Sequence, residues 1–162
     1  MKRISLIAAS IGLMIVLLEL PAIAQDPKTP PRLSSEKLEA LLKGLKIDFK
    51  KSPHEKAKGA FRYDYERNGV KIRLINFNSE DLWIESIFND KLSLEEVNGW
   101  NVKAKFSRCV LIPADDKSEK AIPSISLEAQ LDCFGGVTEG MARQFINRFD
   151  EELKEFAKYL SK

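Results

Sequence analysis

Hydrophobic and polar residues alternate through residues 61–76, and the dipeptide Asn68-Gly69 lies near the middle of this stretch. Asn-Gly is the dipeptide that most favours a two-residue hairpin turn, because both turn positions need positive φ. Pairing across the turn sets Tyr65 opposite Ile72 and brings nearly all apolar side chains of both strands to one face. The pattern therefore predicts an antiparallel hairpin with one buried face and one face in water.

Three further segments have the alternation or the composition of strands, at residues 81–88, 106–112 and 125–133. The last of them alternates without exception, with apolar residues at odd positions and polar residues at even ones, so it should be half buried. Residues 47–49 should extend only briefly, and residues 50–59 should form a loop. The sequence thus predicts five strands.

Three segments combine helical periodicity with capping residues. The first begins at Ser34 or Ser35. The second begins with a capping box at residues 93–96 and runs to about Lys103. The third is long and is capped by Thr138.

The first and third helices each carry an apolar stripe. The stripes are Leu38, Leu41, Leu42 and Leu45, and then Met141, Phe145, Phe149, Leu153, Phe156 and Leu160. The order is helix, three strands, helix, two strands and long helix, with short connections that suit antiparallel strands. We therefore expect an α+β domain with a five-stranded antiparallel sheet and three helices.

The N-terminus has the three regions of a secretory signal peptide over residues 1–24. Two basic residues precede an apolar run at 4–18, which is shorter than the ~20 residues of a membrane span, and a small-x-small site ends at Ala24. We expect cleavage after Ala24, no membrane span afterwards and a periplasmic or secreted location; an uncleaved anchor is the alternative. Residues 25–33 hold three prolines and should form an extended linker, so the folded domain should span residues 34–162.

Charge is nearly balanced once the leader is removed. The leader takes two of 26 basic residues and one of 24 acidic residues, which leaves 24 minus 23, a net charge of +1. A nucleic-acid-binding protein needs a basic excess gathered on one face, so we expect no nucleic-acid partner. Residues 43–58 are an exception, with six lysines and two acidic residues. They form either a solvated loop or a contact for an anionic lipid or an acidic partner.

Cys109 and Cys133 are the only cysteines. An oxidising compartment makes a disulfide the first hypothesis. A hairpin joining residues 106–112 to 125–133 would instead place the two sulfurs more than about 20 Å apart along the sheet. Because a disulfide needs Cα atoms within ~7 Å of each other, we expect two free, buried thiols.

The sequence lacks the residue sets of common catalytic and metal centres. His54 is the only histidine, so neither a Ser-His-Asp triad nor a histidine-rich metal site can be assembled. Gly135 and Gly136 precede a helix without a complete phosphate-binding fingerprint, and we expect them to turn the chain from strand to helix. We predict no catalytic residue, no metal and no cofactor.

The most distinctive residues lie in the second predicted helix and at the start of the strand that follows it. Asn98 and Asn101 are three residues apart, which places them on one helical face. They either bind a polar ligand or satisfy backbone groups where the helix meets the sheet, with Trp100 covering the junction. Phe106 begins the next strand. We interpret this stretch as a structural junction.

These residues and the order of elements resemble the YbjN family, bacterial proteins described as sensory transduction regulators with a domain similar to the type III secretion chaperones. The resemblance covers residues 34–160. It is most specific at Asn98-Gly-Trp-Asn101, Phe106-Ser-Arg108, Gly135-Gly-Val-Thr138 and Phe156-Ala-Lys-Tyr-Leu160. It implies a chaperone-like α+β fold and implies no catalytic residue, metal or cofactor.

A possible partner surface lies on the strand at residues 81–88, where Trp83 and Ile87 face away from the predicted core. With Ile75 and Phe77 they would form an apolar patch on an otherwise polar face. Either a helix or a terminal segment covers this patch, or it marks a partner or dimer surface.

The sequence therefore predicts a non-enzymatic, exported interaction module that recognises a protein or peptide segment, as a monomer or a homodimer. The alternative is a carrier of a small apolar or lipid-like ligand held between the sheet and the C-terminal helix. An enclosed pocket lined by residues such as Phe145 and Phe149 would favour the carrier.

Overall fold

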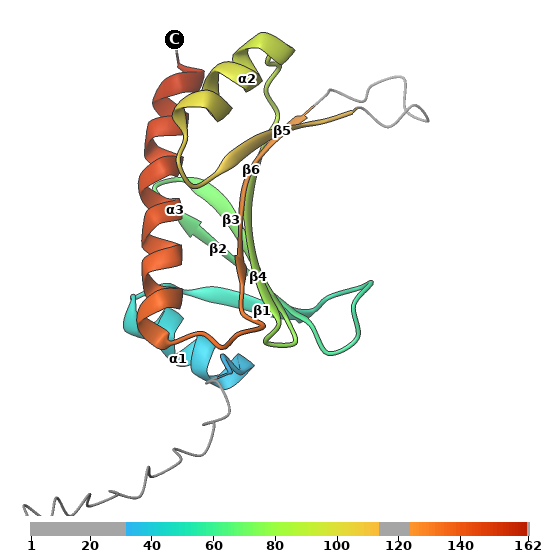
Figure 1. Ribbon diagram of the computed structural model, residues 1–162, viewed down its shortest axis with the longest axis vertical. Coiled ribbons are helices and arrows are strands. Elements are labelled where there is room, and N and C mark those ends of the chain that lie inside the picture. The colour runs from blue at the N-terminus through green and yellow to red at the C-terminus, as the bar shows by residue number, and fades with distance from the viewer. Residues whose placement is uncertain (1–31, 114–123, 162) are drawn as a thin grey trace, which may run out of the picture.

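The structure, a computed structural model, describes residues 32–113 and 124–161. Within these ranges three helices and six strands form one α+β domain (Figure 1). In chain order they are α1 (Ser35–Gly44), β1 (Phe49–Pro53), β2 (Phe61–Arg67), β3 (Val70–Phe77), β4 (Asp81–Phe88), α2 (Leu94–Lys103), β5 (Arg108–Ile112), β6 (Ser124–Asp132) and α3 (Glu139–Leu160). The predicted signal peptide and most of the predicted linker lie outside the described residues.

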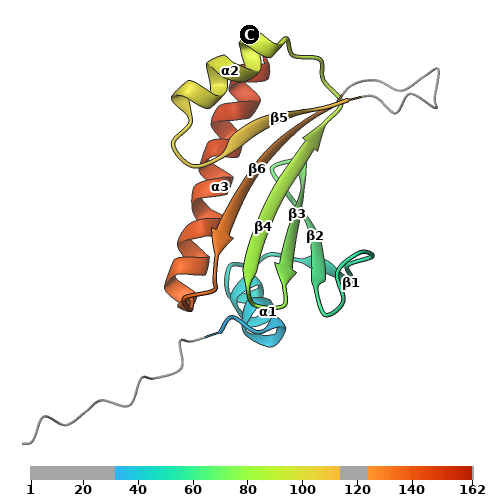
Figure 2. The same ribbon diagram turned by 45° about the vertical axis from the view of Figure 1, so that its right-hand side comes forward.

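The strands form a single antiparallel sheet in the order β1-β2-β3-β4-β6-β5. Helix α3 crosses one face of the sheet, with α1 beside its first turns and α2 beside its last turns (Figure 1, Figure 2). No helix in the described ranges covers the opposite face. The sheet bends so that this helix-free side lies inside the bend (Figure 1).

The predicted hairpin is confirmed in type and register. Arg67 pairs with Val70, and the ladder continues to Phe61 opposite Asn76. Asn68 has φ 53° and Gly69 has φ 80°, the positive values that a two-residue hairpin turn requires. The α+β class, the three helices and the antiparallel sheet are likewise confirmed.

The prediction of five strands is wrong, because residues 49–53 form a sixth strand, β1, at the edge beside β2. Its lysines and proline have the composition of a loop, but charged residues and proline also protect edge strands from unwanted pairing. Tertiary contacts support the strand: the ammonium of Lys51 lies 2.7 Å from a carboxylate oxygen of Glu39 and 4.0 Å from the centre of the Phe61 ring.

The packed domain also begins earlier than the predicted boundary at residue 34. Leu33 is only 2% exposed and belongs to the hydrophobic core. Its carbonyl oxygen accepts hydrogen bonds from Asn76 Nδ2 at 3.1 Å and from Ser79 Oγ at 2.9 Å. Leu33 is therefore part of the folded domain rather than of an extended linker.

All three helices begin at the predicted caps, where a side chain accepts a hydrogen bond from an amide of the first turn. The caps are Ser34, Ser93 and Thr138, and Ser93 forms a complete capping box with Glu96. The stripe of α3 is correct except at Met141, which is 46% exposed. Ala142 and Ile146 are buried there, because the neighbouring elements lie slightly to one side of the predicted stripe.

Two details of the last hairpin also differ from prediction. Strand β5 begins at Arg108, because the chain leaves the sheet at residues 104–107. Strand β6 is buried on both faces over part of its length, including Ser126 and Glu128. Since β6 lies between β4 and β5, side chains from both neighbours shield these two residues.

Candidate functional site

The helix-free side of the sheet is the candidate site, and we call it the open face. It is formed by alternate side chains of β2 to β6, including Asp64, Arg73, Ile75, Trp83, Glu85, Ile87, Arg108, Glu128 and Gln130. The four residues of the predicted apolar patch lie on this face. Ile75 and Trp83 are register partners on β3 and β4, while Phe77 lies at the end of β3.

These four residues do not form a continuous apolar surface. Ile87 is 46% exposed, Trp83 and Phe77 are partly buried, and Ile75 is only 7% exposed. In the described ranges no helix lies over Ile75, and side chains of the neighbouring strands and of the β1–β2 loop lie beside it. The open face is therefore mixed, with small apolar areas between charged groups.

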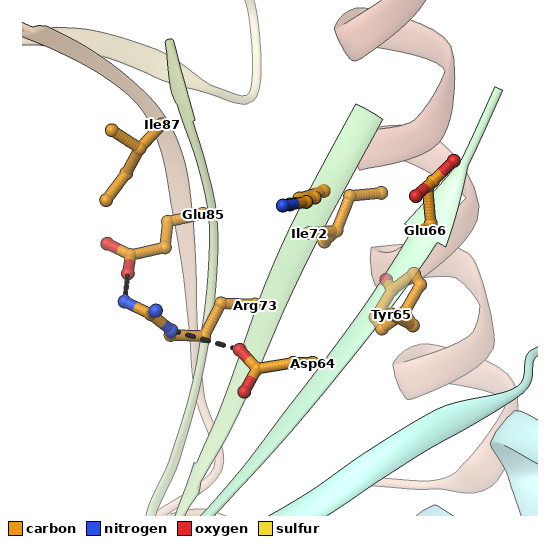
Figure 3. A pocket seen from close by; sticks show the side chains of 8 residues that line it. Asp64, Tyr65, Glu66, Ile72, Arg73, Glu85 and Ile87 are labelled. Atoms are coloured by element: carbon orange, nitrogen blue, oxygen red, sulfur yellow. Dashed lines mark hydrogen bonds and ion pairs between the residues drawn. The ribbon is translucent and has the colours of Figure 1, made fainter. Parts of the chain in front are cut away.

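A chain of ion pairs crosses the open face from β2 to β4. Arg62 Nε lies 2.8 Å from Asp64 Oδ2, and Arg73 Nε lies 3.2 Å from Asp64 Oδ1. Arg73 Nη1 continues the chain to Glu85 Oε1 at 2.9 Å (Figure 3). Partly exposed pairs of this kind each contribute little to stability, but together they hold the side chains in fixed positions.

Trp83 is held by the same network. Its Nε1 donates a hydrogen bond to Glu85 Oε2 at 3.4 Å, and the guanidinium of Arg108 lies 5.6 Å from the centre of the indole ring. Arg108 Nε in turn bonds Glu128 Oε1 at 2.6 Å. A partly exposed indole with a fixed orientation is the kind of anchor that protein interfaces use.

Three hollows open on this side. The largest, about 510 Å³, is lined by Asp64, Tyr65, Glu66, Lys71, Ile72, Arg73, Glu85 and Ile87 (Figure 3). A second, of about 320 Å³, lies where the β1–β2 loop meets Arg62 and Ile75, and it includes His54. A third, of about 250 Å³, lies beside Trp83 and Gln130. The open face thus combines recesses with fixed polar groups.

The lysine-rich stretch at residues 43–58 does not form one surface. It spans the end of α1, all of β1 and the following loop. Lys51 is paired with Glu39, and the backbone amides of Lys56 and Ala57 donate to His54 Nδ1. His54 packs edge-on against Phe77 with ring centres 5.4 Å apart. These contacts give the stretch a structural role at one end of the open face.

Most of the residues that carry the resemblance to the YbjN family lie on the helix side of the sheet. Asn101 bonds both backbone groups of Cys109, accepting from N–H at 2.7 Å and donating to C=O at 3.0 Å. Trp100 is buried and packs against Phe156, with ring centres 4.8 Å apart. Phe106 contacts Phe145 edge-on at 5.4 Å. Together they join α2, β5 and α3.

The other motif positions have different surroundings. Asn98 is exposed on α2. Gly136 has φ 91°, so the turn from β6 to α3 needs a residue without a Cβ there, and Gly135 precedes it in the same turn. No hydrogen bond of Asn98 links it to Asn101 in the described part of the chain, so the structure separates the roles of the two asparagines.

Glu152 has a structural role that the sequence pattern missed. Its carboxylate accepts hydrogen bonds from Ser107 N–H at 2.7 Å, from the Ser107 hydroxyl and from Lys105 N–H at 3.3 Å. It therefore fixes the turn between α2 and β5 against α3. A glutamate on the polar side of an amphipathic helix carries no local signal of such a long-range contact.

A second polar cluster lies under the sheet, between β2 and α3. Arg67 Nε lies 3.5 Å from Asp150 Oδ2, and Arg67 Nη2 donates to the carbonyl of Leu45 at 3.3 Å. Burial raises the pKa of Asp150, and Arg67 and Lys154 offset only part of this rise. Burial also raises the pKa of Tyr65, and the nearby charge of Asp150 adds to it. The cluster ties the end of α1 to β2 and α3.

The two cysteines are free and buried, as predicted. Burial raises the pKa of the Cys109 thiol to about 11, and the carboxylate of Glu128 adds to the rise. Burial likewise raises the pKa of Cys133. In the described ranges, no group of three or more histidine, cysteine or acidic residues is placed to hold a metal ion.

Native Cys109 is expected to react very slowly with iodoacetamide near neutral pH, because only about one thiol in ten thousand would be ionised there. Modification should become fast when the protein is unfolded in urea. Mass spectrometry of the alkylated protein measures both rates. Rapid native modification, or a Cys109–Cys133 disulfide, would contradict the burial and the register of the last hairpin.

No helix in the described ranges is both long enough and apolar enough to cross a membrane.

Comparison with known proteins gives the fold. No protein-family model matches the sequence, and no curated protein does.

Similar solved structures include the following two. YbjN from E. coli, described as a proposed transcription regulator, matches with a TM-score of 0.56 at 13% identity, over 73% of this chain and 84% of YbjN. An uncharacterized protein from Methanothermobacter thermautotrophicus matches with a TM-score of 0.48 at 17% identity, over 76% of this chain and 94% of that one. The fold of this chain is therefore YbjN-like.

Proposed function

We propose that this protein is a non-enzymatic interaction module of the bacterial envelope, which binds a protein or peptide segment on the open face of its sheet. The observation that carries the proposal is that the open face is uncovered and holds a fixed aromatic side chain. In the described ranges no helix covers it, it is recessed, and it holds Trp83 in a fixed orientation between Arg108 and Glu85. Aromatic anchors surrounded by polar groups are typical of protein interfaces.

The envelope location rests on the leader-like pattern of residues 1–24. A regulatory role is consistent with the YbjN-like fold, since YbjN itself is described as a proposed transcription regulator. The chaperone-like role rests on the resemblance of the sequence alone. A binding module that acts on another protein is consistent with either role.

The carrier of an apolar ligand receives less support. Phe145 and Phe149 are buried in the core, and Phe145 packs edge-on against Phe106. The hollows described above and those at the two ends of the helical layer are lined by other residues. The space between the sheet and α3 is thus occupied by side chains where the carrier would need a cavity.

Site-specific photo-crosslinking tests the proposed surface. A photoreactive phenylalanine analogue at Ile87, on the open face, is expected to give covalent adducts with polypeptides in intact cells. The same analogue at Val102 is the matched control, since Val102 is 87% exposed but lies on α2. Electrophoresis and mass spectrometry identify the adducts.

Adducts from Ile87 should fall at least tenfold when Trp83 is also replaced by aspartate, because the charge removes the aromatic anchor. Equal yields from positions 87 and 102 would contradict the proposed surface. Lipid adducts without polypeptide adducts would favour the carrier instead.

A further inference from the structure

Strand β6 has an unpaired edge. On one side it pairs with β4 along its whole length, from Ile125 to Asp132. On the other side it pairs with β5 only from Ser124 to Glu128. Figure 2 shows β6 continuing past the start of β5. Within the part of the chain that the structure describes, residues 129–132 therefore have no neighbouring strand on that side.

The direction of the backbone groups along this edge follows from two hydrogen bonds. Cys133 N–H donates to Glu80 O at 2.7 Å, which directs the odd-numbered residues of β6 toward β4. The N–H and C=O of Cys109 bond Asn101 and therefore point away from β6. Its neighbours Arg108 and Val110 point the other way, so they bond their partners Glu128 and Ser126, which are even-numbered residues of β6. The N–H and C=O of Gln130 and Asp132 must then point to the open edge.

A hollow lies beside the first two residues of this edge, Ala129 and Gln130. The chain leaves the sheet before Arg108, and Glu152 holds the departing turn against α3. The third hollow of the open face, about 250 Å³, is lined by this turn and by Trp83, Ala129 and Gln130. It lies where the line of β5 would continue.

Two exposed apolar side chains lie near the same edge. Met141 falls on the line of α3 that also carries Phe145 and Glu152, which contact the α2–β5 turn; Met141 lies one turn before Phe145. Phe134, directly after Cys133, is 84% exposed. An added strand would present alternate side chains to this apolar side and to the open face.

The charges on the open face select the partner. Asp81 and Asp132 are register partners, so both acidic side chains belong to the same face, and Asp132 Oδ1 accepts a hydrogen bond from the Phe134 N–H at 2.8 Å. Neither forms an ion pair in the described part of the chain. Like charges in this position are unfavourable, and a basic side chain beside Asp132 would relieve the repulsion.

We propose that residues 129–132 of β6 bind an extended polypeptide segment by strand addition. The segment places a lysine or arginine beside Asp132 and an adjacent apolar residue toward Met141. Its backbone forms up to four hydrogen bonds with Gln130 and Asp132, each of which offers one N–H and one C=O. A second copy of this chain fits less well, because its own segment 129–132 contains no basic residue. This inference rests on the proposed polypeptide-binding function and specifies its mode.

Hydrogen exchange in the purified protein tests the edge directly. The amides of Gln130 and Asp132 are expected to exchange fast, and those of Ala129 and Leu131 slowly, because only the latter bond to β4. Phage-displayed random linear peptides selected on the protein serve as the probe. A selected peptide should slow exchange at Gln130 and Asp132 at least tenfold. Protection of these amides without peptide would indicate self-pairing and overturn the proposal, as would a failure to select any peptide.

Two variants of Gln130 separate strand addition from side-chain recognition. Gln130→Pro removes an N–H that forms no ladder bond and is expected to weaken binding of the selected peptide at least tenfold. Gln130→Thr keeps the N–H and should bind within about threefold of the original protein. If the proline variant does not fold, the selected peptide N-methylated along one edge provides the same test, with the same loss expected.

Trp83→Asp distinguishes the two proposals. Loss of binding in both Trp83→Asp and Gln130→Pro supports both. Loss in Trp83→Asp with unchanged binding in Gln130→Pro would overturn strand addition and leave the open face as the binding surface. Loss only in Gln130→Pro would support strand addition and reject Trp83 as an anchor. Unchanged binding in both would reject both.

Discussion

Phe156→Ala is expected to lower the free energy of unfolding by about 3–5 kcal/mol, the usual cost of removing a buried phenylalanine. Phe156 is fully buried. Its ring centre lies 4.8 Å from Trp100, 5.4 Å from Phe88 and 6.3 Å from Tyr159. These partners come from α2, β4 and α3, so a cavity at this point loosens three elements at once. Urea denaturation followed by circular dichroism measures the change.

Phe134→Ala is the matched control, because the same atoms are removed from a side chain that is 84% exposed. Its stability should change by no more than about 0.5 kcal/mol, as for most surface substitutions. If strand addition to β6 is correct, this variant should also weaken binding of the selected peptide. Similar losses of stability in both variants would contradict the packing of Phe156.

Glu152→Ala is expected to lower the free energy of unfolding by about 2–3 kcal/mol, since hydrogen bonds to a charged group are each worth more than neutral ones. The substitution leaves the amides of Lys105 and Ser107 without the carboxylate that accepts from them. The turn between α2 and β5 should then become mobile. Equilibrium denaturation gives the energy, and hydrogen exchange at Ser107 reports the local loss.

Two further variants make this result specific. Glu152→Gln keeps one acceptor and should lose about half as much stability. Glu155→Ala removes a carboxylate from the same helix that pairs only with the exposed Lys158, so it should change stability by less than about 0.5 kcal/mol. Equal effects at positions 152 and 155 would show that the turn does not depend on Glu152.

Local patterns were reliable where neighbouring residues alone decide the structure. Asn68-Gly69 fixed the turn and the register of β2 and β3, because a two-residue turn leaves one way to pair the strands. Ser93 and Glu96 fixed the start of α2 through bonds within a single turn. The separation of Cys109 from Cys133 followed from strand geometry, and both thiols are free.

Patterns failed where a distant contact decides. Strand β1 has the composition of a loop and is supported by Glu39 and Phe61 from other elements. Leu33 is buried through bonds to Asn76 and Ser79, more than forty positions away. Met141 follows the correct periodicity, yet it is exposed because no element in the described ranges covers the first turn of α3 at this position.

The candidate site shows the same division. The alternation of β4 was enough to place Trp83 and Ile87 on the face away from the core. It could not show that Arg73 and Arg108 would divide the predicted patch, because those contacts join residues of different strands.

The sequence by itself determined the helices, the hairpin, the faces of β2, β3 and β4 and the resemblance to the YbjN family, since these depend on residue patterns and on short-range hydrogen bonds. Only the tertiary structure decided that β1 joins the sheet and that Glu152 holds the chain away before β5. It also decided that Gln130 and Asp132, which pair with β4, have no partner strand on the β5 side within the described ranges. Strand order and strand length relative to a neighbour are relations between distant segments, and no local pattern of residues encodes them.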